Sequence, residues 1–559
     1  MTLKSFSTIM RVFFCGLFCL AAVGGSAAMF NVREFGAKAD HTNNDAPAIQ
    51  AAIDACNQSG GGEVLVPSGN YFAGKIVLKS NVTLKLENGA TIWASGNIGD
   101  YEKDPTKDEH GYWCVATNAE NIAIAGDGKI VGTGQAELGR REDENKTPLP
   151  AHRFGIIHFS NCRNVRLRDF GILFSEAHAM VFNECQDVFV DGVSILNNFL
   201  RTNTDGIDPT SCTNVFISNC RIVAGDDCIC PKTEKGIPLE NLVVDNCILE
   251  SIAGAVKLGT GSSGDFRDIK VSNCVIRNSG VGIGLFIKDG GTVERASFSN
   301  ISIETTSQDT PINARLRNNI IPIYIDLGKR NPDSPLSRIR DVSFSDIQIE
   351  SDNSIVIQGL PERAIENLTL RNISFRVKKA FDFSARTKRE GGKSTYKDEN
   401  NTRYVRQPAC IALANINGLT VDNVRVAIDE NVFKQFDRSA LAIFNSQNCT
   451  VENVRREPLG KTGGQPVVVF SDCAQMFVTG CFAPPGTPVF LGLSGEKNEG
   501  DSPCGQRPEA GDNAGHAQQR GFFERGSRRC CATLNFRPAG TAGSKPLFVL
   551  ERASVGAEN

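Results

Sequence analysis

The sequence lacks an excess of charge of either sign. Its 559 residues include 60 Lys and Arg against 63 Asp and Glu, so the charge balance does not point to nucleic acid or to a membrane surface as a partner. After the N-terminus, no apolar run approaches the length of a transmembrane helix. We therefore expect no nucleic-acid partner and, once the N-terminal segment is removed, no contact with a membrane.

A single long apolar run is present, and it stands at the N-terminus. Lys4 and Arg11 precede the run VFFCGLFCLAAVGG, and the small residues SAAM follow it. Basic residues, a short apolar run and then small residues are typical of a secretory signal peptide. This order predicts a signal peptide over residues 1–28 and a secreted protein, extracellular or periplasmic, with a retained anchor as the alternative.

Cysteine spacings typical of zinc sites are missing as well. The 19 cysteines form no CxxC…CxxC pattern and no His/Cys cluster with zinc spacing. The spacing therefore gives no indication of a zinc site.

Three cysteines recur at a fixed interval instead. Cys220, Cys247 and Cys274 each follow an Asn, and equal intervals separate them in the sequence. Cysteines in phase with a structural repeat are typical of a stacked column of small buried side chains, so we expect thiols there. Disulfides are expected among irregularly placed cysteines such as Cys449 and Cys473.

The same interval extends beyond the cysteines. Gly192, Asn219, Asn246, Asn273 and Asn300 are successive steps of 27, within the phrases VFVDGVSI, VFISNCRI, LVVDNCIL, IKVSNCVI and ASFSNISI. Each phrase alternates apolar and polar residues and then breaks at Asn or Gly, as short strands do. A repeat of this length indicates a solenoid.

Two kinds of repeat protein are excluded by what the repeat lacks. The spaced leucines of a leucine-rich repeat are absent, and the interval is too short for a four-stranded propeller blade. The remaining architecture is an all-β parallel β-helix with coils stacked about 4.8 Å apart. Inward aliphatic residues fill its core, and inward Asn and Cys are expected to form ladders at its corners.

The ends of the solenoid are also predicted. The segment NDAPAIQAAIDACNQ, residues 44–58, has the pattern of a short amphipathic helix that caps the first coil. Strand phrases continue to about Gly495, so the β-helix domain is predicted over 29–495, interrupted by a surface loop at 383–404. Residues 496–559 are rich in Gly, Arg and Ala without a strand period, and they predict a disordered tail or a shifted reading frame.

The repeat can be used to place side chains on neighbouring coils. We set DGID (205–208) against DCIC (227–230), GAVK (254–257) and GLFIK (284–288). Alternation then predicts one inward column and one outward column. The inward column is Ile207, Ile229, Val256 and Ile287, and the outward column is Asp208, Cys230, Lys257 and Lys288.

The same register gathers three carboxylates. Asp205 and Asp227 become neighbours on adjacent coils, with Asp226 at the bend just before. Carboxylates can simply end strands, as we expect of Asp191 and Asp245. Three that converge can instead bind calcium, or they can act as acid and base in glycoside hydrolysis.

The motifs resemble those of a known family. The pair NTDGID and GDDCI, together with the opening FNVREFGAKADHTNNDAPAIQAAIDAC, is similar to the polygalacturonase family, glycoside hydrolase family 28. The resemblance extends from about residue 30 to 380 and more loosely to 495. It implies a right-handed parallel β-helix that hydrolyses α-glycosidic bonds in a galacturonan-type pectic chain, with inversion and without a metal or organic cofactor. It further implies that Asp226 is the general acid and that Asp205 and Asp227 hold and deprotonate the attacking water.

The sequence departs from the family pattern in two places. Gly254 stands where the family has the histidine of a Gly-His-Gly motif, and no histidine lies between residues 203 and 290. Phe286 stands at the arginine of an Arg-Ile-Lys motif. A uronate-bearing substrate needs cations, so Lys257 and Lys288 are predicted to bind it.

Three further residues complete the predicted site. Asn203, Asp208 and Tyr324 are predicted to contact substrate, Tyr324 by stacking on a sugar ring. His178, one coil before the site, is predicted to be a surface or corner residue. The chain is expected to act as a monomer on a poly- or oligosaccharide.

Two alternative functions fit the same residues. One is a calcium-dependent pectate-type polysaccharide lyase, which needs a basic Arg or Lys to abstract a proton. The other is a β-helix that binds carbohydrate without cleaving it.

Overall fold

The structure is a computed structural model that describes residues 28–101, 110–135, 153–305, 320–380, 404, 407–433, 437–457, 465–481, 489–495, 531–532 and 547–549. Nearly all of the predicted signal peptide and most of the predicted loop at 383–404 lie outside the described residues. So does most of the segment 496–559.

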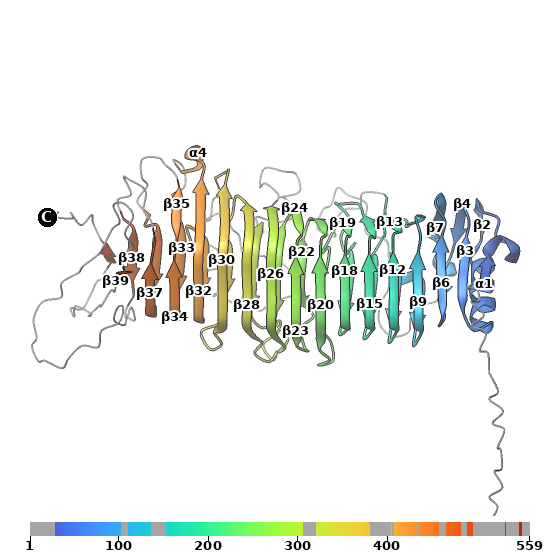
Figure 1. The fold of residues 1–559 in the computed structure, drawn as a ribbon, viewed down its shortest axis with the longest axis horizontal. Coiled ribbons are helices and arrows are strands. Elements are labelled where there is room, and N and C mark those ends of the chain that lie inside the picture. The colour runs from blue at the N-terminus through green and yellow to red at the C-terminus, as the bar shows by residue number, and fades with distance from the viewer. Residues whose placement is uncertain are drawn as a thin grey trace, which may run out of the picture.

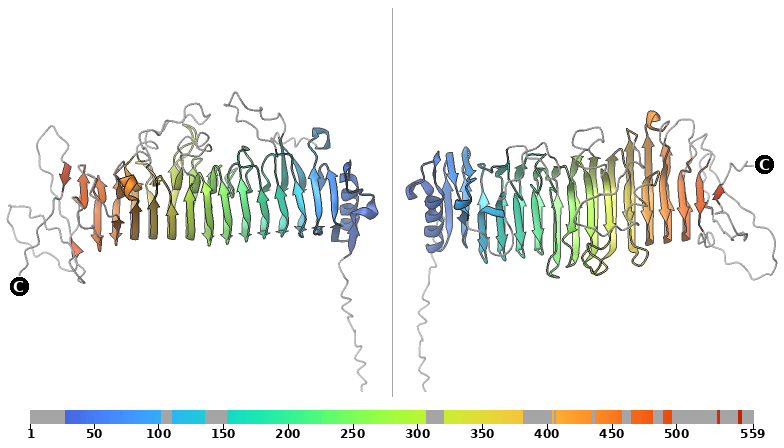
Figure 2. Two further views of the ribbon diagram at one scale, coloured as in Figure 1. Left: turned by 90° about the horizontal axis from the view of Figure 1, so that it is seen from above. Right: turned by 180° about the vertical axis from the view of Figure 1, so that it is seen from behind.

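The described residues form one elongated solenoid (Figure 1). Short strands follow one another around each coil and pair in parallel with the strands of the next coil, and Figure 2 shows that this order is kept on both faces. The coils form a right-handed parallel β-helix, as predicted.

The longest sheet covers two faces of the solenoid and has 26 strands. They are β1 (Met29–Asn31), β2 (Asp40–Asn44), β3 (Gly62–Val66), β4 (Gly69–Ala73), β6 (Val82–Leu86), β7 (Ala90–Ala94), β9 (Glu120–Ala125), β10 (Lys129–Val131), β12 (Arg163–Arg168), β13 (Gly171–Leu173), β15 (Gln186–Asp191), β16 (Ser194–Leu196), β18 (Thr213–Ser218), β19 (Arg221–Ala224), β20 (Leu239–Asp245), β21 (Ile248–Ser251), β23 (Phe266–Ser272), β24 (Val275–Ser279), β26 (Thr292–Thr305), β28 (Arg338–Glu350), β30 (Ile365–Val377), β32 (Ile416–Ile428), β34 (Gln447–Glu452), β35 (Arg455–Glu457), β37 (Ala474–Thr479) and β39 (Cys531–Ala532).

The third face is divided into two sheets. The first contains β5 (Ile76–Val77), β8 (His110–Thr117), β11 (Arg153–Ser160), β14 (Met180–Asn183) and β17 (Ile207–Thr210). The second contains β22 (Gly254–Thr260), β25 (Val281–Ile287), β27 (Ile321–Leu327), β29 (Ile355–Gln358), β31 (Ala409–Ala414), β33 (Ser439–Phe444), β36 (Val468–Ser471), β38 (Leu491–Ser494) and β40 (Leu547–Val549). The described helices are η1 (Val32–Phe35), α1 (Ala46–Gln58), η2 (Ile98–Asp100) and α4 (Glu430–Phe433).

The repeat interval of the sequence is the length of one coil. Thr213 pairs with Glu240, and Leu239 pairs with Phe266, so residues one step apart are direct neighbours. The Asn at each step, such as Asn219 and Asn246, has a positive φ of 56° and 54°. Asn tolerates this left-handed conformation better than most residues, which explains why it recurs where the chain turns between two faces.

The Asn ladder differs from its prediction in one respect. Asn246 donates from Nδ2 to Asn219 Oδ1 at 2.6 Å, and Asn300 donates in the same way to Asn273 at 2.7 Å. These side chains are exposed rather than inward. The left-handed residue lies on the outside of the turn, and the cysteine that follows it turns into the core.

The column of buried thiols is confirmed. Cys220, Cys247 and Cys274 are free and buried on successive coils. The predicted disulfides at Cys449 and Cys473 are wrong, because among the described residues both are buried thiols without a disulfide. They also occupy inward corners: the Sγ of Cys473 donates to the carbonyl of Ile443 at 3.4 Å.

Helix α1 covers the first coil, as predicted (Figure 1). Its buried face consists of Ala46, Ile49, Ala52, Ile53 and Cys56, and it packs against β1, β3 and β6. The helix therefore shields the apolar interior that an open solenoid end would expose to water.

At the other end, β39 and β40 pair antiparallel with β37 and β38. They belong to the segment predicted to be a tail, and its remaining residues lie outside the description. Among the described residues, no helix is both long enough and apolar enough to cross a membrane.

The cap generates a stability prediction. Ile53→Ala removes a fully buried side chain of α1, and we expect the free energy of unfolding to fall by about 2–5 kcal/mol. Urea unfolding measures this loss. The control Gln58→Ala, at an exposed position of the same helix, should change it by less than about 0.5 kcal/mol. Equal effects of the two substitutions would contradict the capping role.

Candidate active site

The pairing of the third face is interrupted between β17 and β22. In the intervening coil, Ile229 forms isolated bridges to Ile207 and Val256. Pro209 and Pro231 supply no N–H to a ladder, which limits regular pairing here. The coil of Asp226 and Asp227 is therefore joined to its neighbours on this face by isolated bridges and separate backbone hydrogen bonds rather than by a regular ladder. Its bend lies between two regular sheets.

Four residues stand in register across this interruption: His178, Asp205, Asp227 and Gly254. The N–H that follows His178 donates to the carbonyl of Asp205 at 2.8 Å, and the N–H of Gly206 donates to that of Asp227 at 2.9 Å. The N–H of Cys228 then donates to the carbonyl of Gly254 at 2.9 Å. This register confirms that Asp205 and Asp227 are neighbours on adjacent coils. It also places His178 directly before them.

Asp205 and Asp227 form a buried carboxylate pair. They are 5% and 1% exposed, and one oxygen of each lies within 4.8 Å of the other and of the Cys230 sulfur. Burial and the carboxylates of Asp208 and Asp226 raise the pKa of Asp205 well above its ordinary value. Burial also raises the pKa of Asp227. Both carboxyl groups therefore keep a proton to higher pH than an ordinary aspartate does.

Asp226 differs from this pair because it is only half-buried. Its Oδ2 accepts a hydrogen bond from the backbone N–H of Asn203 at 3.2 Å. Asn203 is exposed, and its Oδ1 accepts from Nη1 of buried Arg153 at 3.0 Å. Sequence reasoning missed Arg153, because no motif surrounds it. Its guanidinium fixes Asn203, and Asn203 in turn holds the accessible carboxyl of Asp226.

Asp208 is more buried than its predicted outward direction suggested, at 2% exposure. Lys232 covers it from the next coil, with Nζ 2.5 Å from Asp208 Oδ2. Burial alone would lower the pKa of Lys232, but Asp208, Cys230 and Asp205 together raise it well above the ordinary value. Lys232 was not predicted as a site residue, although it follows the inward Ile229 by only three residues.

Lys257 contacts the other buried carboxylate. Its Nζ forms an ion pair with Asp227 Oδ2 and lies 5.7 Å from the centre of the Phe286 ring. Burial alone would lower the pKa of Lys257, but the Asp227 carboxylate raises it above the ordinary value. The prediction that Lys257 lies beside the Asp stack is confirmed.

Gly254 leaves the space that this ion pair occupies. Its N–H donates to Asp227 Oδ1 at 2.9 Å. A Cβ at this position would lie 2.9 Å from the same oxygen and 3.1 Å from Lys257 Cβ. A histidine at 254 would therefore displace Asp227 from its present position.

The predicted register of the next coil is wrong. Lys257 pairs with Gly284, and Thr260 pairs with Ile287, so the inward partner of Val256 is Ile283. Ile287 is buried, but further along the same strand.

Lys288 accordingly lies away from the Asp stack. Its Nζ forms an ion pair with buried Asp326. Tyr324 pairs with Gly284, which pairs with Lys257, so Tyr324 continues the column of Lys257. Its ring meets Phe286 edge-on, with centroids 5.4 Å apart.

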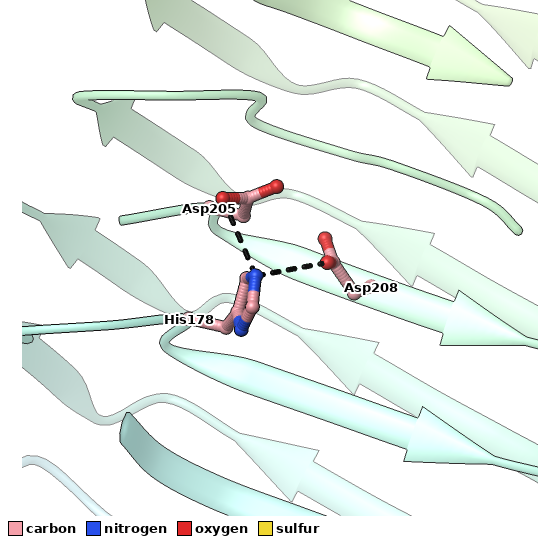
Figure 3. A group of neighbouring side chains, drawn as sticks. All are labelled: His178, Asp205 and Asp208. Carbon is pink, nitrogen blue, oxygen red and sulfur yellow. Dashed lines mark ion pairs between the residues drawn. The ribbon is translucent and has the colours of Figure 1, made fainter. Parts of the chain in front are cut away.

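His178 belongs to the site and is not a remote corner residue. Figure 3 shows its imidazole pointing toward Asp205 and Asp208. Nε2 lies 3.7 Å from Asp205 Oδ1 and 4.0 Å from Asp208 Oδ2. The signal was present in the sequence, because His178 precedes Asp205 by one full repeat interval.

Two groups of described side chains have donor atoms close enough to hold a metal ion. They are His178 with Asp205 and Asp208, and Asp205 with Asp227 and Cys230. Calcium prefers six to eight oxygen ligands, whereas each group includes a nitrogen or a sulfur. Lys232 and Lys257 also hold one oxygen each of Asp208 and Asp227. The donor set therefore fits calcium poorly.

The chain matches the sequence pattern of a known enzyme family. The model of glycosyl hydrolases family 28 matches residues 56–389, more than half of the chain. The chain belongs to this family. It is therefore a glycoside hydrolase.

Named relatives are similar over much of the chain. The "Probable polygalacturonase" of Vitis vinifera is 27% identical, over 48% of this chain and 60% of its own length. The "Endo-polygalacturonase" of Pectobacterium carotovorum subsp. carotovorum is 24% identical, over 58% of this chain and 82% of its own length. The chain thus spans less than two thirds of the length of the Vitis vinifera relative and more than two thirds of the length of the Pectobacterium relative.

Solved structures support the fold. An exopolygalacturonase from Thermotoga maritima superposes with a TM-score of 0.54 at 22% identity, over 63% of this chain and 87% of that chain. A polygalacturonase from Erwinia carotovora superposes with a TM-score of 0.51 at 21% identity, over 63% of this chain and 94% of that chain. Both likenesses agree with a right-handed parallel β-helix.

Within family 28, the departures at Gly254 and Phe286 share one neighbour. Gly254 leaves room for the Asp227–Lys257 pair, and Phe286 receives the Lys257 ammonium near its ring face. Cation–π contacts of this kind are favourable when the cation is desolvated. The two substitutions and Lys257 therefore form one packed unit in this family 28 hydrolase.

The raised pKa of Asp205 generates a stability prediction. Its folded-state pKa exceeds the unfolded value, so its ionisation reduces stability as pH rises through the folded pKa. Asp205→Asn removes this loss. We expect the melting temperature of the variant to exceed that of the wild type at pH 7, with a smaller difference at pH 4.

Asp268 provides a control of opposite sign. A hydrogen bond from Arg295 lowers the pKa of Asp268, so its ionised form stabilises the fold above the unfolded pKa. Asp268→Asn should therefore lower the melting temperature more at pH 7 than at pH 4. Parallel pH dependence of both variants would contradict the assignment.

Proposed function

We propose that this family 28 hydrolase cleaves α-glycosidic bonds in a galacturonan-type pectic poly- or oligosaccharide by single displacement with inversion. The observation that carries the proposal is the convergence of three carboxyl groups from adjacent coils, two buried and one half-buried. The names of the relatives, which are polygalacturonases, support the substrate class.

The different exposure of the carboxyl groups supports a division of roles. Asp226 is accessible, so as the general acid it gives its proton to the glycosidic oxygen while the bond from that oxygen to the anomeric carbon breaks. Asp205 and Asp227 hold a water molecule on the other side of the sugar. The water attacks the anomeric carbon, and its proton passes to one of these carboxylates, which leaves the anomeric configuration inverted.

The neighbouring residues bind the substrate in this proposal. Lys257 and Lys288 keep 22% and 16% of their side chains exposed while each pairs with a buried Asp. They therefore bring positive charge toward the uronate carboxylates. Tyr324 offers a ring face to a sugar, and Asn203 contacts hydroxyl groups, whereas the predicted substrate contact of Asp208 is not kept because Lys232 covers that carboxylate. We also propose an exported protein that acts as a monomer.

Asp226→Asn tests the general acid. This nearly isosteric change removes the transferable proton, and we expect kcat for reducing-sugar release from polygalacturonate and a panel of pectic substrates to fall about 10²–10⁴-fold. The control is Asp191→Asn on β15, where Asp191 accepts hydrogen bonds from Ser218 and Asn219. The assignment is wrong if no substrate is cut or if the Asp226 variant cuts as well as the wild type.

The stereochemistry of the product tests the mechanism. Proton NMR during the first minutes of hydrolysis should show a new reducing end of inverted anomeric configuration. No ultraviolet-absorbing unsaturated sugar should form, and a chelator should not change the rate. An absorbing product that disappears with chelator would identify a calcium-dependent lyase, and a retained configuration would require a covalent intermediate.

A further inference from the structure

A line of side chains extends from the candidate active site toward the N-terminal end. Tyr112 on β8 pairs with Gly155 on β11, and Gly155 is in register with His178, which precedes β14. His178 is in turn in register with Asp205. These four residues occupy one position on four successive coils.

Gly155 allows the first and third members of this line to meet. A Cβ at Gly155 would lie 2.3 Å from Cε1 of the Tyr112 ring, so the ring lies over the glycine. Tyr112 Oη consequently reaches across a whole coil and lies 3.3 Å from His178 Nδ1. Tyr112 is 5% exposed, so its hydroxyl holds the imidazole from a buried position.

The other edge of the imidazole faces two carboxylates. Nε2 is 3.7 Å from Asp205 Oδ1 and 4.0 Å from Asp208 Oδ2 (Figure 3). The Oδ1 atoms of both Asp residues are buried, and neither accepts a hydrogen bond from any residue that the structure describes. Asp208 Oδ2 already accepts from Lys232 Nζ, so a donor on Nε2 points to Asp205 Oδ1 as the buried acceptor that lacks one.

We propose that His178 is a positioning residue of the hydrolase. Tyr112 fixes its Nδ1 edge, and its Nε2–H is presented to Asp205 and Asp208, which orients the Asp205 carboxylate and favours its ionised form. This inference rests on the proposed function, in which Asp205 holds and deprotonates the attacking water.

The charges around His178 support this role. Asp205 and Asp208 face it from the following coil, and Asp226 and Asp227 lie one coil further. Lys232 pairs with Asp208 and Lys257 pairs with Asp227, and Arg153 lies behind Asn203. Among the described ion pairs, Asp205 takes part in the one with His178 and in none with a lysine.

The position of His178 also complements Gly254. The coil after Asp227 has no room for a side chain at 254 without displacing the Asp227–Lys257 pair. In this chain the imidazole approaches the buried carboxylates from the opposite direction: His178 lies on the coil before Asp205, whereas Gly254 lies on the coil after Asp227.

The experiment compares the pH profiles of wild type and His178→Gln. Glutamine keeps an N–H donor but cannot become a cation. We expect the acidic limb of kcat/KM to move to higher pH by about 1 unit, so activity at a pH below the limb falls about tenfold. KM should change less than twofold, because His178 does not contact substrate in this role. Tyr112→Phe should shift the limb in the same direction, and the double variant should add little to His178→Gln.

His158→Gln is the matched control. His158 lies on β11 of the same sheet and also contacts the Tyr112 ring, with centroids 4.7 Å apart. Its Nε2 lies 2.8 Å from Asn183 Nδ2 rather than near the Asp residues. This variant should keep the wild-type limb, and melting temperatures show whether each variant is folded.

Two results would overturn the proposal. One is an unchanged acidic limb in folded, active His178→Gln, and the other is a rise in KM with kcat unchanged, which would make His178 a substrate contact. A wild type that cleaves no pectic substrate defeats the proposed function instead. In that case, nitrogen-15 spectra of labelled histidines test whether His178 makes the proposed contacts. Its Nε2 signal must move in Asp205→Asn, and its Nδ1 signal must move in Tyr112→Phe. If neither signal moves, the proposal fails.

Discussion

Parallel hydrogen bonding between coils, residue on residue, is the constraint on which the rest of this structure depends. Each coil repeats the register of the one before, so a sequence interval becomes a column of neighbouring side chains. The core, the Asn ladder and the thiol column are three consequences of this constraint. The fourth is the line from Tyr112 to Gly254, which brings residues that are far apart in the sequence into one row.

Much of the fold could be predicted from this interval alone. The alternation within each phrase gives the strands, and the repeat gives the register of Asp205 on Asp227 and the buried Ile207, Ile229 and Val256. The prediction failed where it departed from the regular interval. The motif GLFIK suggested a longer step, from Val256 to Ile287, whereas the regular repeat interval leads to Ile283, its true partner.

Two other failures have different physical reasons. The disulfides predicted at Cys449 and Cys473 rested on their irregular spacing, but loops of variable length shift the interval without moving a cysteine out of the core. His178 was misplaced because the family motif directs attention to the coil after the Asp pair. Arg153 and Lys232 act through contacts between coils that no local sequence motif records.

The electrostatics of the site follow from the same stacking. Asp208 and Asp227 each meet a lysine from the following coil, whereas Asp326 meets Lys288 from the coil before it. A buried carboxylate without such a partner reduces stability, yet it provides a group whose proton can be exchanged. Of these buried carboxylates, Asp205 is the one without a lysine in the described ion pairs, so its proton is the one that the site can exchange.

The thiol column has a consequence for how this protein can be made. The cysteines whose side chains are described form no disulfide with one another, and nearly all are buried in the solenoid interior. The described fold therefore requires no oxidative step, and a reducing cell interior is a suitable place to produce it. An oxidising compartment presents the opposite hazard, since a coil that has not yet closed exposes thiols that can be cross-linked before they reach the core.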